Sequence, residues 1–208
     1  MENPTKENII KAYNVARQCG ADSTCKVLET LYPDVDFTPK DNRTVTERIK
    51  TFEDACEALG DDHALVERYR VFEHDVRASI GGEHLVDMAA YLQLSIIVAA
   101  LNEGWEPEFN DDEIRWVPWF VFYTKEELDD VDEDWKQSHT FLPLEGRVVG
   151  RSNDNASAYG GLVFAGAYNA SSYANTYYGA RLAFKTAELA EYAGKQFIEI
   201  YADFILAR

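Results

Sequence analysis

The chain has 208 residues, enough for one large domain or two small ones with a sizeable core. Hydrophobic residues make up 46% of it and aromatic residues 13%, which is typical of a globular protein and not of a disordered one. The formal net charge of −17 argues against broad nucleic-acid binding and docking on anionic membranes, because so negative a surface repels phosphate groups. The same charge leaves open that the chain imitates nucleic acid in a partner's basic cleft.

The cysteines and the apolar segments indicate a protein made in a reducing compartment. Cys19, Cys25 and Cys56 are odd in number and lack metal-binding spacing, so reduced thiols are expected. The N-terminus lacks the apolar core of a signal peptide, and the longest apolar run, residues 94–101, is far too short to span a bilayer. We therefore expect the chain to fold in the cytosol.

Helical periodicity dominates the first half of the sequence. A helix is expected to start after Pro4, where apolar residues begin to recur every three or four positions. Further helices are expected over residues 22–32, 44–59, 63–76 and 83–101. The last of these segments is apolar around most of its circumference, which is typical of a buried central helix.

The second half of the sequence mixes strands and helices. Large aromatic residues become frequent from Trp105, and residues 115–123 predict a strand packed on the helices. The other expected segments are a short acidic helix or loop over 125–136, strands over 147–150, 162–165 and 181–184, and an amphipathic helix over 186–206. These patterns predict an α+β fold, with a helical region over 1–104 and an aromatic-rich α+β region over 105–208, or a single mixed domain.

No group of residues forms a recognisable catalytic or metal-binding motif. The acidic run 129–134 starts like an EF-hand loop, but Trp135 stands where the turn requires glycine and Phe141 where the loop requires glutamate. His63 and Glu67 are one helical turn apart without a third ligand, which favours an ordinary surface pair. Nucleophile and phosphate-loop motifs are absent. We therefore expect no catalytic residue, metal or cofactor, and an enzyme of unrecognised type stays as an alternative.

Residues 152–180 differ in composition from the rest of the chain. This segment contains a single charged residue, Asp154, and consists mainly of Asn, Ser, Ala, Gly, Thr and Tyr. Binding loops favour such residues, because tyrosine offers a large contact at a small entropy cost while Ser and Asn supply adaptable hydrogen bonds. The segment indicates either a ligand-binding surface or a pair of polar turns between strands, and its tyrosines favour the ligand surface.

Four blocks of the sequence are distinctive: RIKTFEDACEALG at 48–60, IIVAALNEGWEPEF at 96–109, VPWF at 117–120 and GARLAFKTAELAEYAGKQFIEIYADF at 179–204. These blocks resemble an uncharacterised protein family common in Bacteroides-type gut bacteria, their prophages and other mobile elements. They span much of the chain. The resemblance implies an origin on a phage or prophage, and it carries no assigned activity.

A second resemblance concerns residues 150–184, which are similar to the variable region of C-type-lectin-like proteins diversified by phage and bacterial retroelements. Such regions end in a G-x-R-L-A signature, matched here at 179–183, whereas the usual entry motif is represented only by residues 150–152. A helix also follows the signature, where chains of that kind end. The resemblance implies ligand-binding positions at Asn153, Asn155, Ser157, Tyr159, Tyr168, Asn169, Ser171, Tyr173, Asn175 and Tyr177.

These observations favour a phage- or prophage-encoded binding protein that displays a Tyr/Asn/Ser-rich surface on a small β-rich, C-type-lectin-like part. Arg181 is expected to be structural, and Leu182 and Phe184 to lie in the core. The expected partner is a protein or a glycan, with no nucleic acid and no membrane, and the expected location is the bacterial cytoplasm or a virion. An acidic cytosolic effector that binds a basic host protein is the alternative from another class. The sequence does not indicate the oligomeric state.

Overall fold

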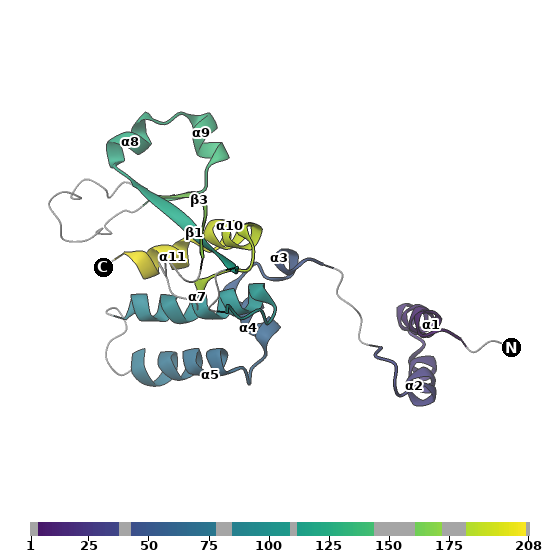
Figure 1. The fold of residues 1–208 in the computed structure, drawn as a ribbon. Helices are drawn as coiled ribbons and strands as arrows, with labels where there is room; N and C mark the ends of the chain where they lie inside the picture. The colour runs from purple at the N-terminus through teal and green to yellow at the C-terminus, as the bar shows by residue number, and fades with distance from the viewer. Residues whose placement is uncertain are drawn as a thin grey trace. The chain divides into compact units, whose positions relative to one another are not determined.

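The chain has an α+β fold, as the sequence predicted (Figure 1). The computed structural model describes residues 4–37, 43–77, 85–108, 112–143, 161–171 and 182–206. Its elements, in order, are α1 (Lys6–Gln18), α2 (Asp22–Leu31), α3 (Val45–Arg48), α4 (Phe52–Leu59), α5 (Ala64–Val71), the π-helix η1 (Phe72–Arg77), α7 (Val86–Asn102), β1 (Ile114–Tyr123), α8 (Lys125–Asp130), α9 (Glu133–Ser138), β2 (Phe141–Pro143), β3 (Gly161–Ser171), α10 (Ala187–Gln196) and α11 (Ile198–Ile205). Among the residues described, no helix combines the length and apolar character that crossing a bilayer requires.

The chain falls into two compact units, Met1–Arg43 and Thr44–Arg208. The helix α7 therefore shares a unit with the strands, and β1 contacts α10 of the same unit. The first unit consists of α1, α2 and the residues that follow them. Its first helix begins where the sequence predicted, because the Thr5 hydroxyl accepts a hydrogen bond from the Asn8 N–H and caps the helix.

The second unit is built around α7, which confirms the prediction of a buried central helix. Residues from all sides of α7 are buried, among them Leu94, Ile96, Ile97 and Leu101. The helix contacts α4 and α5 on one side and α10 and α11 on the other, and α10 in turn contacts β1 and β3. Figure 1 shows this layered order, from α5 through α7 to α10, α11 and the sheet.

Two predicted long helices are wrong in detail, because each is divided by a break. The segment 44–59 forms α3 and α4, and Thr44 and Thr51 each begin a new helix with a reciprocal capping box. The segment 186–206 forms α10 and α11, which meet at Phe197. Apolar residues on both sides of each break still reach the core. Ile49, Ala55 and Leu189 lie in one cluster, and α11 contributes to that cluster and to a second one with Leu162.

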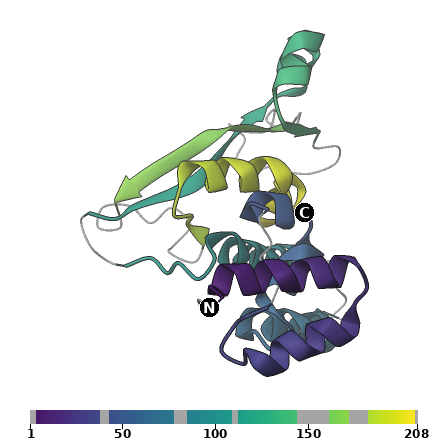
Figure 2. The same ribbon diagram turned by 90° about the vertical axis from the view of Figure 1, so that its right-hand side faces the viewer.

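The sheet has three antiparallel strands in the order β1-β3-β2. The strand predicted over 115–123 is confirmed as β1, and its partner β3 is longer than the predicted 162–165. The register shifts between Trp119 and Phe120, which face Gly166 and Phe164, so Ala165 is the extra residue of a β-bulge. Figure 2 shows β1 and β3 as one long ribbon with α10 against one of its faces.

The segment that leads into α10 contributes core residues instead of the strand predicted over 181–184. Leu182, Ala183 and Phe184 are buried, which confirms Leu182 and Phe184 as core. Among the described residues of this segment, Phe184 pairs with the sheet through an isolated bridge to Trp116. Arg181 and the strand expected over 147–150 lie outside the described residues.

A buried asparagine joins this segment to the end of α7. The Asn102 side chain donates to the Ala183 carbonyl at 2.9 Å and accepts from the Lys185 N–H at 3.1 Å. The Lys185 ammonium donates to the Asn102 carbonyl at 3.1 Å. The buried amide is therefore paired on both its donor and its acceptor side, as a polar group in a core must be. These hydrogen bonds hold the end of α7 to the segment that leads into α10.

Candidate recognition surface

Three of the ten sequence-predicted ligand-binding positions lie on β3. These are Tyr168, Asn169 and Ser171, and the first two are exposed. The other seven positions lie outside the described residues: Asn153, Asn155, Ser157, Tyr159, Tyr173, Asn175 and Tyr177. Residues 153–159 precede Gly161, where β3 begins, and residues 173–177 follow Ser171, where it ends. The two groups therefore join the chain at opposite ends of a strand that spans about 33 Å.

The two faces of the β1–β3 pair differ in what covers them. Side chains alternate between faces along a strand, and directly paired residues of antiparallel strands share a face. Phe120, Pro118 and Phe164 face the helices: Phe120 packs on the core, and Pro118 and Phe164 both approach α10. Trp119 and Val121 point the other way and remain 39% and 41% exposed. We call this second side the outer face.

Trp119 and Tyr168 form an exposed aromatic pair on the outer face. Their ring centroids lie 5.8 Å apart with the planes inclined by 43°, and Tyr168 is 47% exposed. Together with Ala165, Gly166 and Ala167 they line a hollow of about 450 Å³. Figure 2 shows no described helix over this middle part of the sheet. Two large rings beside a backbone-lined hollow can take a flat or apolar group of a ligand.

Gly166 shapes the floor of this hollow. Its φ is +149°, a backbone conformation that residues with a side chain rarely adopt, and it lies at the bulge opposite Trp119. An added Cβ there would meet nothing within 4 Å, so the position needs glycine for its backbone and not for space. The bulge and the glycine leave open surface next to the Trp119 ring, where a side chain would otherwise stand.

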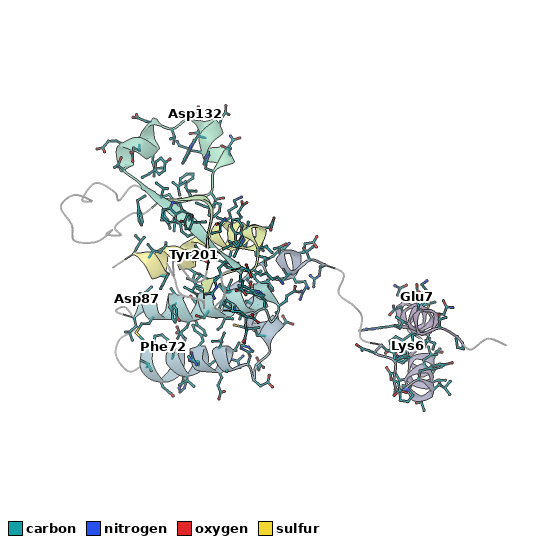
Figure 3. All side chains as sticks on the ribbon, in the orientation of Figure 1. Lys6, Glu7, Phe72, Asp87, Asp132 and Tyr201 are labelled. Carbon is teal, nitrogen blue, oxygen red and sulfur yellow. The ribbon has the colours of Figure 1, made fainter. Side chains whose placement is uncertain are left out.

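The opposite side of the sheet holds the aromatic pair on a rigid support. Phe120 lies edge-on to Phe164 at 6.0 Å and packs on the buried Tyr201 at 5.1 Å. Figure 3 labels Tyr201 in the layer between the sheet and α7. Gly194 brings α10 so close that an added Cβ would lie 2.6 Å from the Phe164 ring and 2.7 Å from the Pro118 Cβ. The outer face therefore rests on a close-packed layer.

Asn169 is exposed but does not join Tyr168. It pairs with Trp116, and the alternation of side chains therefore places it on the helix-facing side of the strand, beyond the part that the core covers. The structure thus brings Tyr168 together with Trp119 and Gly166, two residues that the sequence did not single out. Trp119 was missed because β1 is apolar at nearly every position, so its sequence gives no contrast between the two faces.

The acidic lobe formed by α8 and α9 lies at one end of the ribbon. Trp135 stacks on His139 at 4.3 Å and packs beside Tyr123, so an aromatic cluster holds the lobe to the sheet. Asp132 caps α9 by accepting from the Trp135 N–H at 2.7 Å, and Figure 3 shows it at the outer end of the lobe. This carboxylate therefore has a structural role at the start of a helix.

The histidine of the His63–Glu67 pair also has a structural role. His63 is the N-cap of α5, and its Nδ1 accepts from the Leu65 N–H at 3.3 Å. Among the described residues, no group of three or more His, Cys, Asp or Glu side chains is arranged to hold a metal ion. The outer face, with its uncharged and exposed aromatic pair, is the candidate surface that the sequence and the structure share.

Comparison with known proteins adds no relative to this picture. No protein-family model, no curated protein and no solved structure matches the chain.

Proposed function

We propose that the chain is a non-enzymatic binding protein that uses the outer face of the β1–β3 pair as its recognition surface. The Trp119–Tyr168 pair forms the centre of this surface, and the partner is a protein or a glycan. The observation that carries the proposal is the exposure of two contacting aromatic rings over a rigid layer. Trp and Tyr are among the residues that most often dominate binding energy, because they bury a large area at a small entropy cost.

The composition of the flanking sequence supports the same surface. Tyr168 lies within the uncharged segment 152–180, whose Tyr, Asn and Ser content is typical of binding loops. The strand β3 carries the middle of this segment on the sheet, with further candidate positions on both sides along the chain. A rigid strand that presents part of a variable-looking segment is a suitable framework for recognition.

The proposal includes a phage or prophage origin and diversification of residues 150–184, both supported by the sequence resemblances alone. In this proposal the protein acts in the bacterial cytoplasm or as part of a virion. Sequencing the DNA around the gene tests the diversification. A reverse-transcriptase gene and a near-copy of the region encoding residues 150–184 are expected, and the lack of both contradicts this part of the proposal.

Selection of ligands with the purified chain tests the recognition surface. A random peptide display library and a glycan array provide both partner classes, and the double variant Trp119→Ala/Tyr168→Ala removes the aromatic pair. We expect ligands whose affinity falls at least about thirtyfold in the double variant, since even one such anchor contributes about 2 kcal/mol or more. Val71→Ala is the matched control, because Val71 is 51% exposed on α5 and away from the sheet. Equal binding by the double variant and Val71→Ala, or no ligand from either library, contradicts the proposal.

A further inference from the structure

The edge of β3 continues beyond its neighbouring strand. β2 pairs only with Gly161, Leu162 and Val163, and the Phe164 N–H donates to the Thr140 carbonyl at 2.9 Å. β3 then runs on to Ser171 with β1 on one side. Within the described ranges, no strand lies along the other side of Ala165–Ser171. An exposed strand edge is a template on which another extended chain can pair.

The register identifies which backbone groups point to this edge. Trp116 exchanges two hydrogen bonds with Phe184, so its N–H and C=O point away from β3. Trp116 pairs with Asn169, which makes this a non-hydrogen-bonded pair of the antiparallel ladder. Two residues along, Pro118 and Ala167 form the next pair of this kind. The N–H and C=O groups of Ala167 and Asn169 therefore point away from β1, toward the edge.

The two edges of the ribbon are not equivalent. At the edge of β1 that points away from β3, the backbone groups of Trp116 are already bonded to Phe184. The next residue of β1 whose backbone points to this edge is Pro118, which has no N–H to offer. Proline at this place blunts the edge against pairing. The edge of β3, in contrast, carries an N–H donor and a C=O acceptor at both Ala167 and Asn169. An added strand would therefore pair with β3 and not with β1.

The distribution of charge indicates which kind of strand fits. β3 has no charged residue, whereas residues 125–136 after β1 hold seven Asp or Glu and two Lys. This acidic segment lies against β3, because a Cβ on Gly161 would be 2.6 Å from the Leu128 side chain. An uncharged edge beside an acidic segment, on a chain with a net charge of −17, suits a partner with cationic side chains. A second copy of this chain would bring another −17.

We propose that an extended basic peptide segment adds as a strand to β3 along Ala167–Asn169. The proposal rests on the recognition function above and specifies the partner. Alternate apolar side chains of the peptide lie beside the Trp119–Tyr168 pair, and its Lys or Arg side chains meet the acidic segment 125–136. Main-chain hydrogen bonds supply the affinity, and the aromatic pair and the charges supply the preference, as in other cases of strand addition.

A peptide of eight alternating Lys and Val residues, blocked at both ends, is the probe. Asn169→Pro removes one N–H that points to the edge and leaves the β1 ladder intact, while Asn169→Ala removes only the side chain. We expect Asn169→Pro to weaken binding about tenfold relative to Asn169→Ala, because one hydrogen bond and the strand geometry are lost. The same peptide N-methylated at every residue has no N–H to offer to β3 and is expected to lose binding to the wild-type chain, which needs no variant to fold.

Three results overturn the added strand: equal binding of the methylated peptide, equal binding by both Asn169 variants, or no binding of the Lys–Val peptide. Equal binding of an alternating Glu–Val peptide overturns the choice of a basic partner. The recognition surface is tested separately, by the Trp119→Ala/Tyr168→Ala variant. A selected ligand that depends on the aromatic pair but ignores Asn169→Pro leaves the recognition surface in place and removes only the strand addition.

Discussion

The rings of Trp119 and Tyr168 lie 5.8 Å apart on the face of the sheet that α10 does not cover. One ring comes from β1 and the other from β3, and the bulge at Gly166 opens the surface between them. Neither ring is needed to fill the core, which lies on the opposite side of the sheet. Mutations on the outer face and on the helix-facing side of the sheet are therefore expected to change the free energy of unfolding by different amounts.

Removal of the aromatic pair is expected to cost little stability. We expect Trp119→Ala and Tyr168→Ala each to lower the free energy of unfolding by about 1 kcal/mol or less, because both rings are about two-fifths exposed or more. Phe164→Ala, on the buried face of the same strand pair, is expected to cost about 3–5 kcal/mol. Urea unfolding of the three variants measures the contrast. Similar losses in all three would mean that the pair is structural.

Gly194→Ala is expected to destabilise the protein although alanine is the better helix former. On an exposed helix the change would stabilise by up to about 1 kcal/mol. Here the new methyl group would meet the Phe164 ring and the Pro118 Cβ, so a loss of about 1–3 kcal/mol is expected from overpacking. Thermal unfolding measures the sign of the effect. A rise in Tm would show that α10 is not packed closely on the sheet.

Asn102→Ala is expected to cost about 2 kcal/mol or more, because it leaves the Ala183 carbonyl and the Lys185 N–H without their partner. Ser95→Ala is the matched control from the same helix. Ser95 is also buried, but its hydroxyl bonds only the Tyr91 carbonyl one turn earlier, so a change below about 1 kcal/mol is expected. Urea unfolding separates the two outcomes. Equal losses of stability in the two variants would mean that Asn102 does not join α7 to the segment before α10.

Tyr192→Phe is expected to have an effect that depends on pH. The Tyr192 hydroxyl donates to the Ile49 carbonyl at 2.7 Å, and burial, then the charge of Asp54, raises the pKa of this tyrosine. The native state therefore favours the neutral phenol, whereas the unfolded chain ionises near the ordinary pKa of about 10. Wild-type protein is expected to be more stable than the variant by about 1 kcal/mol below that pH.

As the pH rises above about 10, the unfolded wild-type chain loses its phenol proton first, so the stability advantage over Tyr192→Phe is expected to shrink. Urea unfolding of both proteins between pH 8 and pH 11 gives the difference directly, and other titrating groups cancel in it. A constant difference across this range contradicts the burial of the hydroxyl.

The fold class and the central helix were predictable because their signals are local and strong. α7 is apolar around its circumference, and only a buried helix satisfies that pattern. The break between α3 and α4 was missed although Thr51 and Asp54 form a capping box, since the apolar period runs on through Val45, Ile49 and Phe52. Capping chemistry overrode periodicity at that point.

The candidate surface was predictable only in part. The uncharged Tyr/Asn/Ser composition led to Tyr168, but it hid the true length of β3, because these residues are as typical of turns as of an exposed strand. Trp119 carries no such signal, and its partnership with Tyr168 depends on the register of two strands far apart in the sequence. Register and face follow from tertiary pairing, which composition does not encode.

Amide hydrogen exchange on the complex with a selected ligand tests the recognition surface most directly. Binding at the outer face is expected to slow exchange at residues 117–121 and 165–169, beyond the protection that β1 and β3 already give each other. Protection confined to α1 and α2, or to α4 and α5, with the strands unchanged, would contradict the proposal that this aromatic face binds the partner.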